Sequence, residues 1–340
     1  ILLGYPQDVD LQQAMNRGEV DVAVGTHALI QSEVRLPRLG LAIVDEQHRF
    51  GVAQRAALRG PHGNVHLLVM TATPIPRTLA LTLYGDLDVS VIDELPPGRR
   101  PVKTLVIGAH ERDAAYAFVI DQLRQGRQAF VICPLVEESE ALEVRAATAE
   151  YERLKGVFTS AALALLHGRM PAAKKDEVMR AFRDGLYDVL VSTAVVEVGI
   201  DVPNATVIMV EGAERFGLAQ LHQFRGRVGR GEHQSYCFLM AESASEEARE
   251  RLRLMEEIAD GFRLAEEDLR LRGPGEYFGT RQSGLPELKI ASLADTRLLE
   301  QARNEAVRWL ANGAALEDTP LAAYASEVAR LLSGAGGDVS

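Results

Sequence analysis

Cysteine is scarce in this sequence, and long apolar runs are absent. The chain has only two cysteines in 340 residues, Cys133 and Cys237, and both lie inside apolar segments. Two such distant residues suggest neither a disulfide framework nor a zinc site. No stretch of about 18 uninterrupted apolar residues occurs, and no basic-then-apolar leader opens the chain. We therefore expect a reducing, cytoplasmic setting and no membrane partner.

Positive charge is also in deficit. Asp and Glu number 48 against 37 Lys and Arg, which leaves a formal net charge of -11. This balance argues against a protein whose whole surface coats nucleic acid. It leaves room for a local basic track, which is sufficient to bind and release DNA phosphates.

The dipeptide Gly-Lys is missing altogether. It forms the core of the phosphate-binding loop GxxxxGK[ST], whose backbone amides and lysine hold the phosphates of a nucleotide. The chain by itself is therefore expected to bind ATP poorly or not at all.

The most informative stretch that is present covers residues 39–52, LGLAIVDEQHRFGV. Its apolar run, residues 39–44, predicts a strand buried on both faces of a parallel sheet. Asp45 and Glu46 follow at the carboxyl end of this strand, where ligands of open α/β sheets bind. One carboxylate there can hold Mg²⁺ while the other orients a water. The alternative is that the acidic pair merely caps the next helix or loop.

A second apolar strand, residues 65–70, runs into TATPIPRT at residues 71–78. Two buried strands that each end in a polar loop are expected to place DEQH and TAT side by side. These segments resemble motifs II and III of the superfamily 2 helicases. The resemblance implies that Asp45 binds Mg²⁺, that Glu46 activates the attacking water and that His48 contacts nucleotide. It also implies that Thr71 and Thr73 couple the nucleotide site to DNA.

The segment before this stretch predicts a helix over residues 9–17 that stops at Gly18, followed by a strand over residues 20–24. GTHALIQ comes next. It resembles motif Ib, so Gly25 and Thr26 are expected to touch a DNA backbone, although a plain strand-to-helix turn fits equally well. In helicases of this type the phosphate loop precedes motif Ib. We therefore expect it upstream of this chain, which reads as a fragment of a longer polypeptide.

The composition changes at residues 93–101, DELPPGRRP, which has the character of a stiff connector between compact units. Its Arg99 and Arg100 are either solvated linker charges or DNA contacts. Beyond it, strands alternate with helices, which predicts βαβ units and a parallel sheet. The expected strands cover residues 102–107, 128–133, 162–166, 189–192 and 236–240; the expected helices cover 112–125, 139–155 and a charged segment ending at Phe182.

Two further segments resemble helicase motifs V and VI, namely STAVVEVGIDVPNA from residue 192 and LHQFRGRVGRG at residues 221–231. Arg227 and Arg230 are three residues apart, on one face if the segment is helical. Two guanidinium groups can neutralise charge on a transferring phosphoryl group. The alternative is a basic, glycine-broken surface loop. The resemblance implies further roles for four residues: nucleotide or water positioning by Gln223, nucleotide contacts by Asp201 and Gly199, and DNA contact by Thr193.

Residues 245–265 predict a solvated helical hairpin. The following stretch, residues 268–293, is Gly-rich and Arg-bearing and has neither helical nor strand periodicity. It resembles the translocation motif that the RecG family of branched-DNA helicases shares with the bacterial transcription-repair coupling translocases. In those families it links lobe closure to movement along duplex DNA. The residues expected to do so here are Arg270, Arg272, Arg281 and Gln282. Beyond them, one or two short helices are expected.

The sequence therefore predicts an α/β protein with two RecA-like lobes, the first of them incomplete. The expected divisions are a partial lobe (1–94), a linker (95–103), a second lobe (104–243), a hairpin with the translocation motif (244–293) and a helical tail (294–340). The resemblance implies the motor portion of a bacterial ATP-dependent DNA helicase of RecG type in recombination and repair, using ATP and Mg²⁺ on duplex and branched DNA. It further implies a monomer near the nucleoid that can meet single-stranded DNA-binding protein. The alternatives are a coupling translocase or, for this chain alone, a non-catalytic DNA-binding or docking module.

Overall fold

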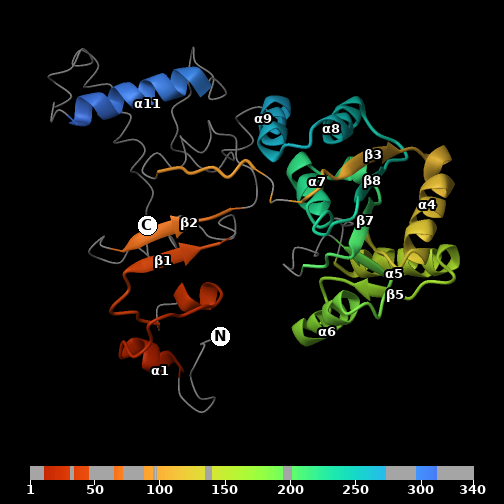
Figure 1. Ribbon diagram of the computed structural model, residues 1–340, viewed down its shortest axis with the longest axis horizontal. Coiled ribbons are helices and arrows are strands. Elements are labelled where there is room, and N and C mark those ends of the chain that lie inside the picture. Colours follow the sequence, from red (N-terminus) through yellow and green to blue (C-terminus); the bar gives the residue numbers. More distant parts are fainter. Residues whose placement is uncertain are drawn as a thin grey trace. The chain divides into compact units, whose positions relative to one another are not determined.

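The computed structural model describes residues 11–30, 34–45, 65–71, 88–94, 96, 98–134, 140–193, 201–272 and 296–311. The chain divides into two compact units, residues 1–73 and residues 74–340, and each is described by itself (Figure 1). The predicted linker, residues 95–103, falls inside the second unit, and the domain boundaries expected from the sequence remain predictions.

The first unit begins with helix α1 (Leu11–Asn16), which confirms the predicted helix and its stop. Gly18 adopts a left-handed conformation with φ of 71°. The Gly18 amide donates to the Met15 carbonyl at 3.0 Å and the Glu19 amide donates to the Ala14 carbonyl at 3.1 Å. This pair of bonds is the Schellman ending that glycine favours, because a side chain strains the left-handed conformation.

The predicted strand at residues 20–24 is wrong. The segment belongs to no strand, Asp21 lies in a bend, and Val22 and Val24 are 71% and 59% exposed. A strand needs a ladder of hydrogen bonds from a neighbouring strand, and the described ladder of this unit joins two other segments. A 3₁₀ turn, η1 (His27–Ile30), follows.

That ladder pairs β1 (Leu41–Val44) with β2 (His66–Val69) in parallel, as the sequence predicts. The prediction that β1 is buried on both faces is wrong. Ala42 and Val44 are buried, whereas Leu41 and Ile43 are 55% and 57% exposed. In the part of the chain that the structure describes, this sheet has two strands and only one of its faces is covered.

The second unit is built on a six-stranded parallel sheet in the order β3-β8-β7-β4-β6-β5 (Figure 1). The five predicted strands are present as β3 (Lys103–Ile107), β4 (Gln128–Cys133), β5 (Leu163–Leu166), β6 (Val189–Thr193) and β8 (Tyr236–Met240). A sixth strand, β7 (Ala205–Val210), was not predicted. Every residue of β4, β6 and β7 is buried, which explains their continuous apolar sequences.

Helices cover both faces of this sheet. On one face α4 (Arg112–Arg124) and α5 (Glu140–Val157) pack through Val119 and Leu154. On the other face lie α6 (Ala172–Arg183), α7 (Leu218–Arg225) and α8 (Glu246–Glu257). Their positions confirm the three-layer α/β unit that the alternating pattern predicts.

The predicted solvated hairpin is wrong in two respects. Helices α8 and α9 (Gly261–Arg272) are present, but Leu252, Met255 and Leu264 belong to the hydrophobic core. In addition, α9 extends through the first residues of the stretch expected to lack periodicity, with Leu269 buried. Charged residues outnumber apolar residues in α8 and α9, so the sequence pattern does not reveal the narrow apolar face of each helix. Helix α11 (Thr296–Ala311) confirms a helix in the predicted tail.

A charged network closes the carboxyl edge of the sheet. Glu211 follows β7, and Arg112 donates to its two carboxylate oxygens at 3.0 and 2.8 Å. The hydroxyl of Tyr116 donates to Glu211 at 3.1 Å and accepts from Arg153. Burial raises the pKa of the Glu211 carboxyl more than the adjacent Arg112 lowers it. The network therefore joins α4 and α5 to the end of β7 at a buried carboxylate.

No described helix is both long and apolar enough to cross a membrane.

We predict that Glu211→Ala lowers the free energy of unfolding by about 3 kcal/mol, because it leaves the partly buried Arg112 guanidinium without its main partner. Glu242→Ala is the matched control. Glu242 also pairs with Arg112, but its side chain is 68% exposed, so its loss is expected to cost less than about 1 kcal/mol. Urea denaturation followed by circular dichroism measures both, and equal losses would contradict the prediction.

Candidate active site

The first unit places two of the predicted segments at one sheet edge. In the parallel pair, Val44 lies opposite Val69, and the Met70 amide donates to the Val44 carbonyl at 2.7 Å. Asp45 directly follows β1, Thr71 lies two residues after β2, and both are exposed. The prediction that the strands bring these two segments to the same edge is confirmed for these residues. Glu46, His48 and Thr73 lie outside the described residues.

The other predicted DNA-contacting residues of this unit, Gly25 and Thr26, are exposed just before η1. A Cβ atom on Gly25 would lie 2.9 Å from the Cγ of Leu29. A larger residue at position 25 would therefore require the Leu29 side chain to move.

In the second unit, Arg227 and Arg230 lie on a short loop that we call the arginine loop, residues 226–231. Helix α7 ends at Arg225, and Gly229 has φ of 75°. The helical spacing considered for Arg227 and Arg230 is therefore wrong, because the glycine turns the chain between them. The Nε of Arg230 instead donates back to the Gly226 carbonyl at 3.1 Å.

Two predicted site residues meet at this loop. The guanidinium of Arg230 lies 3.4 Å from the Oδ1 of Asp201, and the two side chains are 30% and 60% exposed. An exposed ion pair of this kind contributes little free energy. Arg230 is thus held near Asp201 but is free to exchange this partner for a phosphate oxygen at small cost.

The glycines of the arginine loop allow close packing. A Cβ on Gly229 would lie 2.8 Å from the Cγ2 of Val102, and a Cβ on Gly231 would lie 2.6 Å from the Pro203 carbonyl oxygen. Neither position accepts a larger residue without a shift of the chain. The arginines are therefore presented by a loop whose backbone is packed against the segments that enter β3 and β7.

Gln223 and Arg227 are both half-buried, on α7 and on the arginine loop. Arg225, between them, has a different role that the sequence analysis missed. It is 5% exposed and donates to the carbonyls of Met255, Ile258 and Ala259 at 2.8–3.1 Å. Its place on the apolar side of α7, beside Phe224 and four residues after Leu221, was the available signal.

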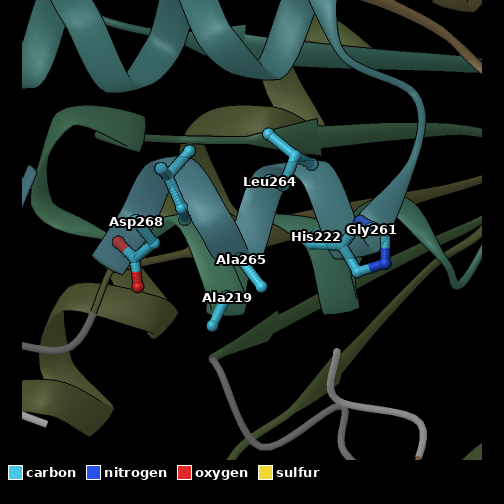
Figure 2. A pocket seen from close by; sticks show the side chains of 7 residues that line it. Ala219, His222, Gly261, Leu264, Ala265 and Asp268 are labelled. Carbon is cyan, nitrogen blue, oxygen red and sulfur yellow. The ribbon is translucent and has the colours of Figure 1, made fainter. Parts of the chain in front are cut away.

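His222 lies beside Arg225, with its Nδ1 3.0 Å from the guanidinium. Burial, reinforced by the charge of Arg225, lowers the pKa of His222 to about 4. This imidazole also lines a small cavity between α7 and α9 (Figure 2). The cavity measures about 10 Å³, and its lining residues are Leu218, Ala219, His222, Gly261, Leu264, Ala265 and Asp268. A water needs about 10–15 Å³, so this is a packing seam between helices and too small for a ligand.

A larger cavity of about 440 Å³ lies at the carboxyl edge of the sheet, around Glu211, Arg112 and Arg153. None of the predicted site residues lines it. Both of these arginines are already paired with glutamates, so the cavity offers no ready phosphate site at their positions.

The remaining predicted residues are spread over the second unit. Thr193 ends β6, is fully buried and has a hydroxyl without a hydrogen-bond partner. Arg270 is exposed on α9 and bonds to Glu267 at 2.6 Å, and Arg272 ends that helix. Gly199, Arg281 and Gln282 lie outside the described residues. The DNA and coupling roles of this group remain predictions.

We predict that His222 makes the second unit sensitive to acid. Its folded pKa lies below its ordinary value of 6.5, so the unfolded chain binds more protons between these two values. Stability is therefore full above pH 6.5 and falls as the pH drops toward 4. At pH 5 this group alone is expected to cost about 2 kcal/mol of the free energy of unfolding.

Urea titrations of the parent and of His222→Gln at pH 7.5 and 5.0 test this prediction, because the variant lacks the titrating imidazole. The variant is expected to lose less stability between the two pH values than the parent. His110→Gln, a change at an exposed histidine, is expected to leave the difference unchanged. The same pH dependence in all three proteins would show that His222 is not responsible.

Two models of protein families match parts of this chain. The model of the Helicase conserved C-terminal domain matches residues 113–232, and that of ATP-dependent DNA helicase RecG, domain 3, C-terminal, matches residues 258–324. The chain is 53% identical to ATP-dependent DNA helicase RecG of Synechocystis sp. over 313 residues, which are 92% of this chain and 38% of that protein. It is 51% identical to the protein of the same name from Bacillus subtilis, over 94% of this chain and 47% of that protein.

A solved structure, described as RecG bound to a three-way DNA junction, is similar at a TM-score of 0.65 and 48% identity. The match covers 85% of this chain and 37% of that one. The chain thus spans less than half the length of these curated relatives. With both domain models in chain order and half of the residues identical over most of its length, the chain belongs to the RecG family.

Proposed function

We propose that this chain is part of the motor of an ATP-dependent DNA helicase and translocase that acts on branched DNA, such as stalled forks and Holliday junctions. The observation that carries the proposal is the similarity, over most of this chain, to a RecG protein bound to a three-way junction. The domain model at residues 258–324 belongs to RecG, which favours this function over that of a coupling translocase. The proposed organisation is that predicted from the sequence, two lobes joined by a linker at residues 95–103.

The carboxyl edge of β1 and β2 would form one wall of the nucleotide site. Asp45 is exposed where a parallel strand ends, which suits a carboxylate that holds Mg²⁺ together with nucleotide phosphates. Bound Mg²⁺ would supply charge neutralisation on the phosphates. Glu46, the next residue, would orient the attacking water and accept its proton.

The arginine loop is proposed to contact the phosphates of the nucleotide. Arg230 is partly exposed and held by a weak ion pair, so it can move to a developing negative charge, and Arg227 would join it. Gln223 would position water or nucleotide, and Asp201, Gly199 and His48 would contact the nucleotide. The sheet edge and the arginine loop are insufficient for ATP turnover without a loop that holds the phosphates. Because the phosphate loop is absent from this sequence, the chain alone is expected to be inactive.

Coupling to DNA would use residues at both units. Exposed Gly25, Thr26 and Thr71 suit contacts to a DNA backbone, and Thr73 and Thr193 are proposed to act with them. Arg270 and Arg272, on α9, would carry motion to Arg281 and Gln282. The complete protein is proposed to act as a cytoplasmic, nucleoid-associated monomer that can meet single-stranded DNA-binding protein.

We predict that Arg230→Ala in the complete protein lowers the rate of ATP hydrolysis by about 1000-fold, because an arginine that faces the transferring phosphoryl group contributes at least this much. DNA affinity is expected to stay unchanged. Arg215→Ala is the matched control, since Arg215 is an exposed arginine in η4 (Ala213–Arg215), after the opposite end of β7. A similar loss in both variants would contradict the assignment.

Glu46→Gln in the complete protein is expected to abolish ATP turnover and to spare DNA binding. The amide keeps the size of the side chain but cannot accept a proton from water. Steady-state hydrolysis and a gel-shift assay with junction DNA measure the two properties. Hydrolysis at the parent rate would show that another residue is the base.

A further inference from the structure

The segment that leads into β3 lies beside the arginine loop because of the sheet topology. Strands β3 and β8 are parallel neighbours, with Lys103 opposite Tyr236 (Figure 1). The residues before each strand therefore meet at the same, amino edge of the sheet. We call residues 98–102 the connector; they precede β3 just as the arginine loop and residues 232–235 precede β8.

Hydrogen bonds tie these two segments together. The side-chain amide of Gln234 donates to the Pro101 carbonyl at 2.8 Å, and the Lys103 amide donates to the Ser235 carbonyl at 2.9 Å. In addition, the Nε of Arg99 donates to the carbonyl of Gly229 at 2.8 Å, across 130 positions of sequence. The contact to Gly229 is the one that reaches the arginine loop itself.

The hydrogen bond from Arg99 to Gly229 matters because of its position in the arginine loop. Gly229 immediately precedes Arg230 and is the residue where the loop turns. Its Cα also packs so closely on Val102 of the connector that a Cβ would clash at 2.8 Å. On the other side of the turn, Arg230 bonds to Gly226. The backbone that presents Arg230 is therefore held by the connector on one side and by its own loop on the other.

The neighbouring Arg100 provides an internal contrast. Arg99 is half-buried against the loop, whereas Arg100 is exposed and forms no hydrogen bond or ion pair with the described residues. Two adjacent arginines in the same segment thus differ in what they touch. Of these two side chains, the one that forms a hydrogen bond with the arginine loop in the described structure is that of Arg99.

We infer that Arg99 is a positioning residue for the arginine loop: it fixes the Gly229 carbonyl and so places Arg230 for catalysis. The inference rests on the proposed function, in which Arg230 faces the transferring phosphoryl group. A guanidinium that donates to a carbonyl forms a charge-assisted hydrogen bond, stronger than one between neutral groups. Movement of the connector is then transmitted directly to the loop that carries the two arginines.

The test uses the complete protein and the variants Arg99→Ala, Arg99→Lys and Arg100→Ala. Arg99→Ala is expected to lower kcat for DNA-stimulated ATP hydrolysis about tenfold, the size expected for one hydrogen bond from a charged donor. KM for ATP and the affinity for junction DNA are expected to stay within about twofold, because the residue touches neither ligand. Arg99→Lys keeps a cationic donor and is expected to recover part of kcat, and Arg100→Ala is expected to match the parent.

Hydrogen exchange measured by mass spectrometry supplies a readout that does not depend on ATP. Peptides covering residues 226–235 are expected to exchange faster in Arg99→Ala than in the parent and in Arg100→Ala. Equal exchange and equal kcat in the two alanine variants would overturn the inference. Weakened DNA binding in Arg99→Ala, with a reduced salt dependence, would also overturn it in favour of a DNA contact.

Failure of the proposed function gives a different result. If the parent protein does not hydrolyse ATP with DNA present, the assignment of Arg230 to catalysis is wrong, whatever the variants do. Exchange at residues 226–235 then decides alone whether Arg99 holds the loop.

Discussion

The parallel direction of all six strands is the constraint on which the second unit depends. Because the strands run the same way, every segment that enters the sheet lies at one edge and every segment that leaves it lies at the other. The arginine loop and the connector enter beside one another at the amino edge, before β8 and β3. The Glu211 network closes the opposite edge, after β7. The arginine loop, with its partly exposed Arg230, and the buried Glu211 network, which stabilises the fold, therefore lie at opposite edges of the sheet.

Two arginines that are five positions apart, Arg225 and Arg230, show how packing gives identical side chains different roles. Arg225 is buried and saturates three carbonyls at the end of α8 and just beyond it, so removing it would leave buried acceptors unpaired. Arg230 is partly exposed, and its interactions with the described residues are a 3.4 Å ion pair and a bond to its own loop. The first arginine fixes α7 on the helices that follow. The second can change partners without disturbing the core.

The core of the fold follows from the sequence where a pattern has one physical explanation. A continuous apolar run such as that of β4 requires burial on both faces, and the glycine after α1 has a left-handed conformation that few other residues tolerate. Residues 20–24 show the limit of this reasoning. Their alternating valines fit a strand, yet a strand also needs a neighbour, and pairing is not encoded locally. The exposed face of β1 has the same cause, since burial depends on what packs against the strand.

The candidate site divides in the same way. The resemblance to helicase motifs selected Asp201 and Arg230, which the structure brings together, and the apolar runs set Asp45 and Thr71 after paired strands. It did not indicate that Arg225 is structural or that Arg99 reaches the Gly229 carbonyl. Those contacts join residues that are 30 and 130 positions apart, and a side chain's partner at such distance depends on the sheet order. The apolar face of α9 was not predicted because charged residues outnumber apolar residues in this helix.

The measurement that tests the central claim most directly is ATP hydrolysis, with and without branched DNA, by this chain and by a longer protein that includes the phosphate loop. The account predicts that only the longer protein turns over and that branched DNA stimulates it. Efficient hydrolysis by this chain alone would contradict the account, because the phosphates would then be held by residues outside the proposed site. Absence of hydrolysis from both proteins would also contradict it, by leaving DNA binding without a motor.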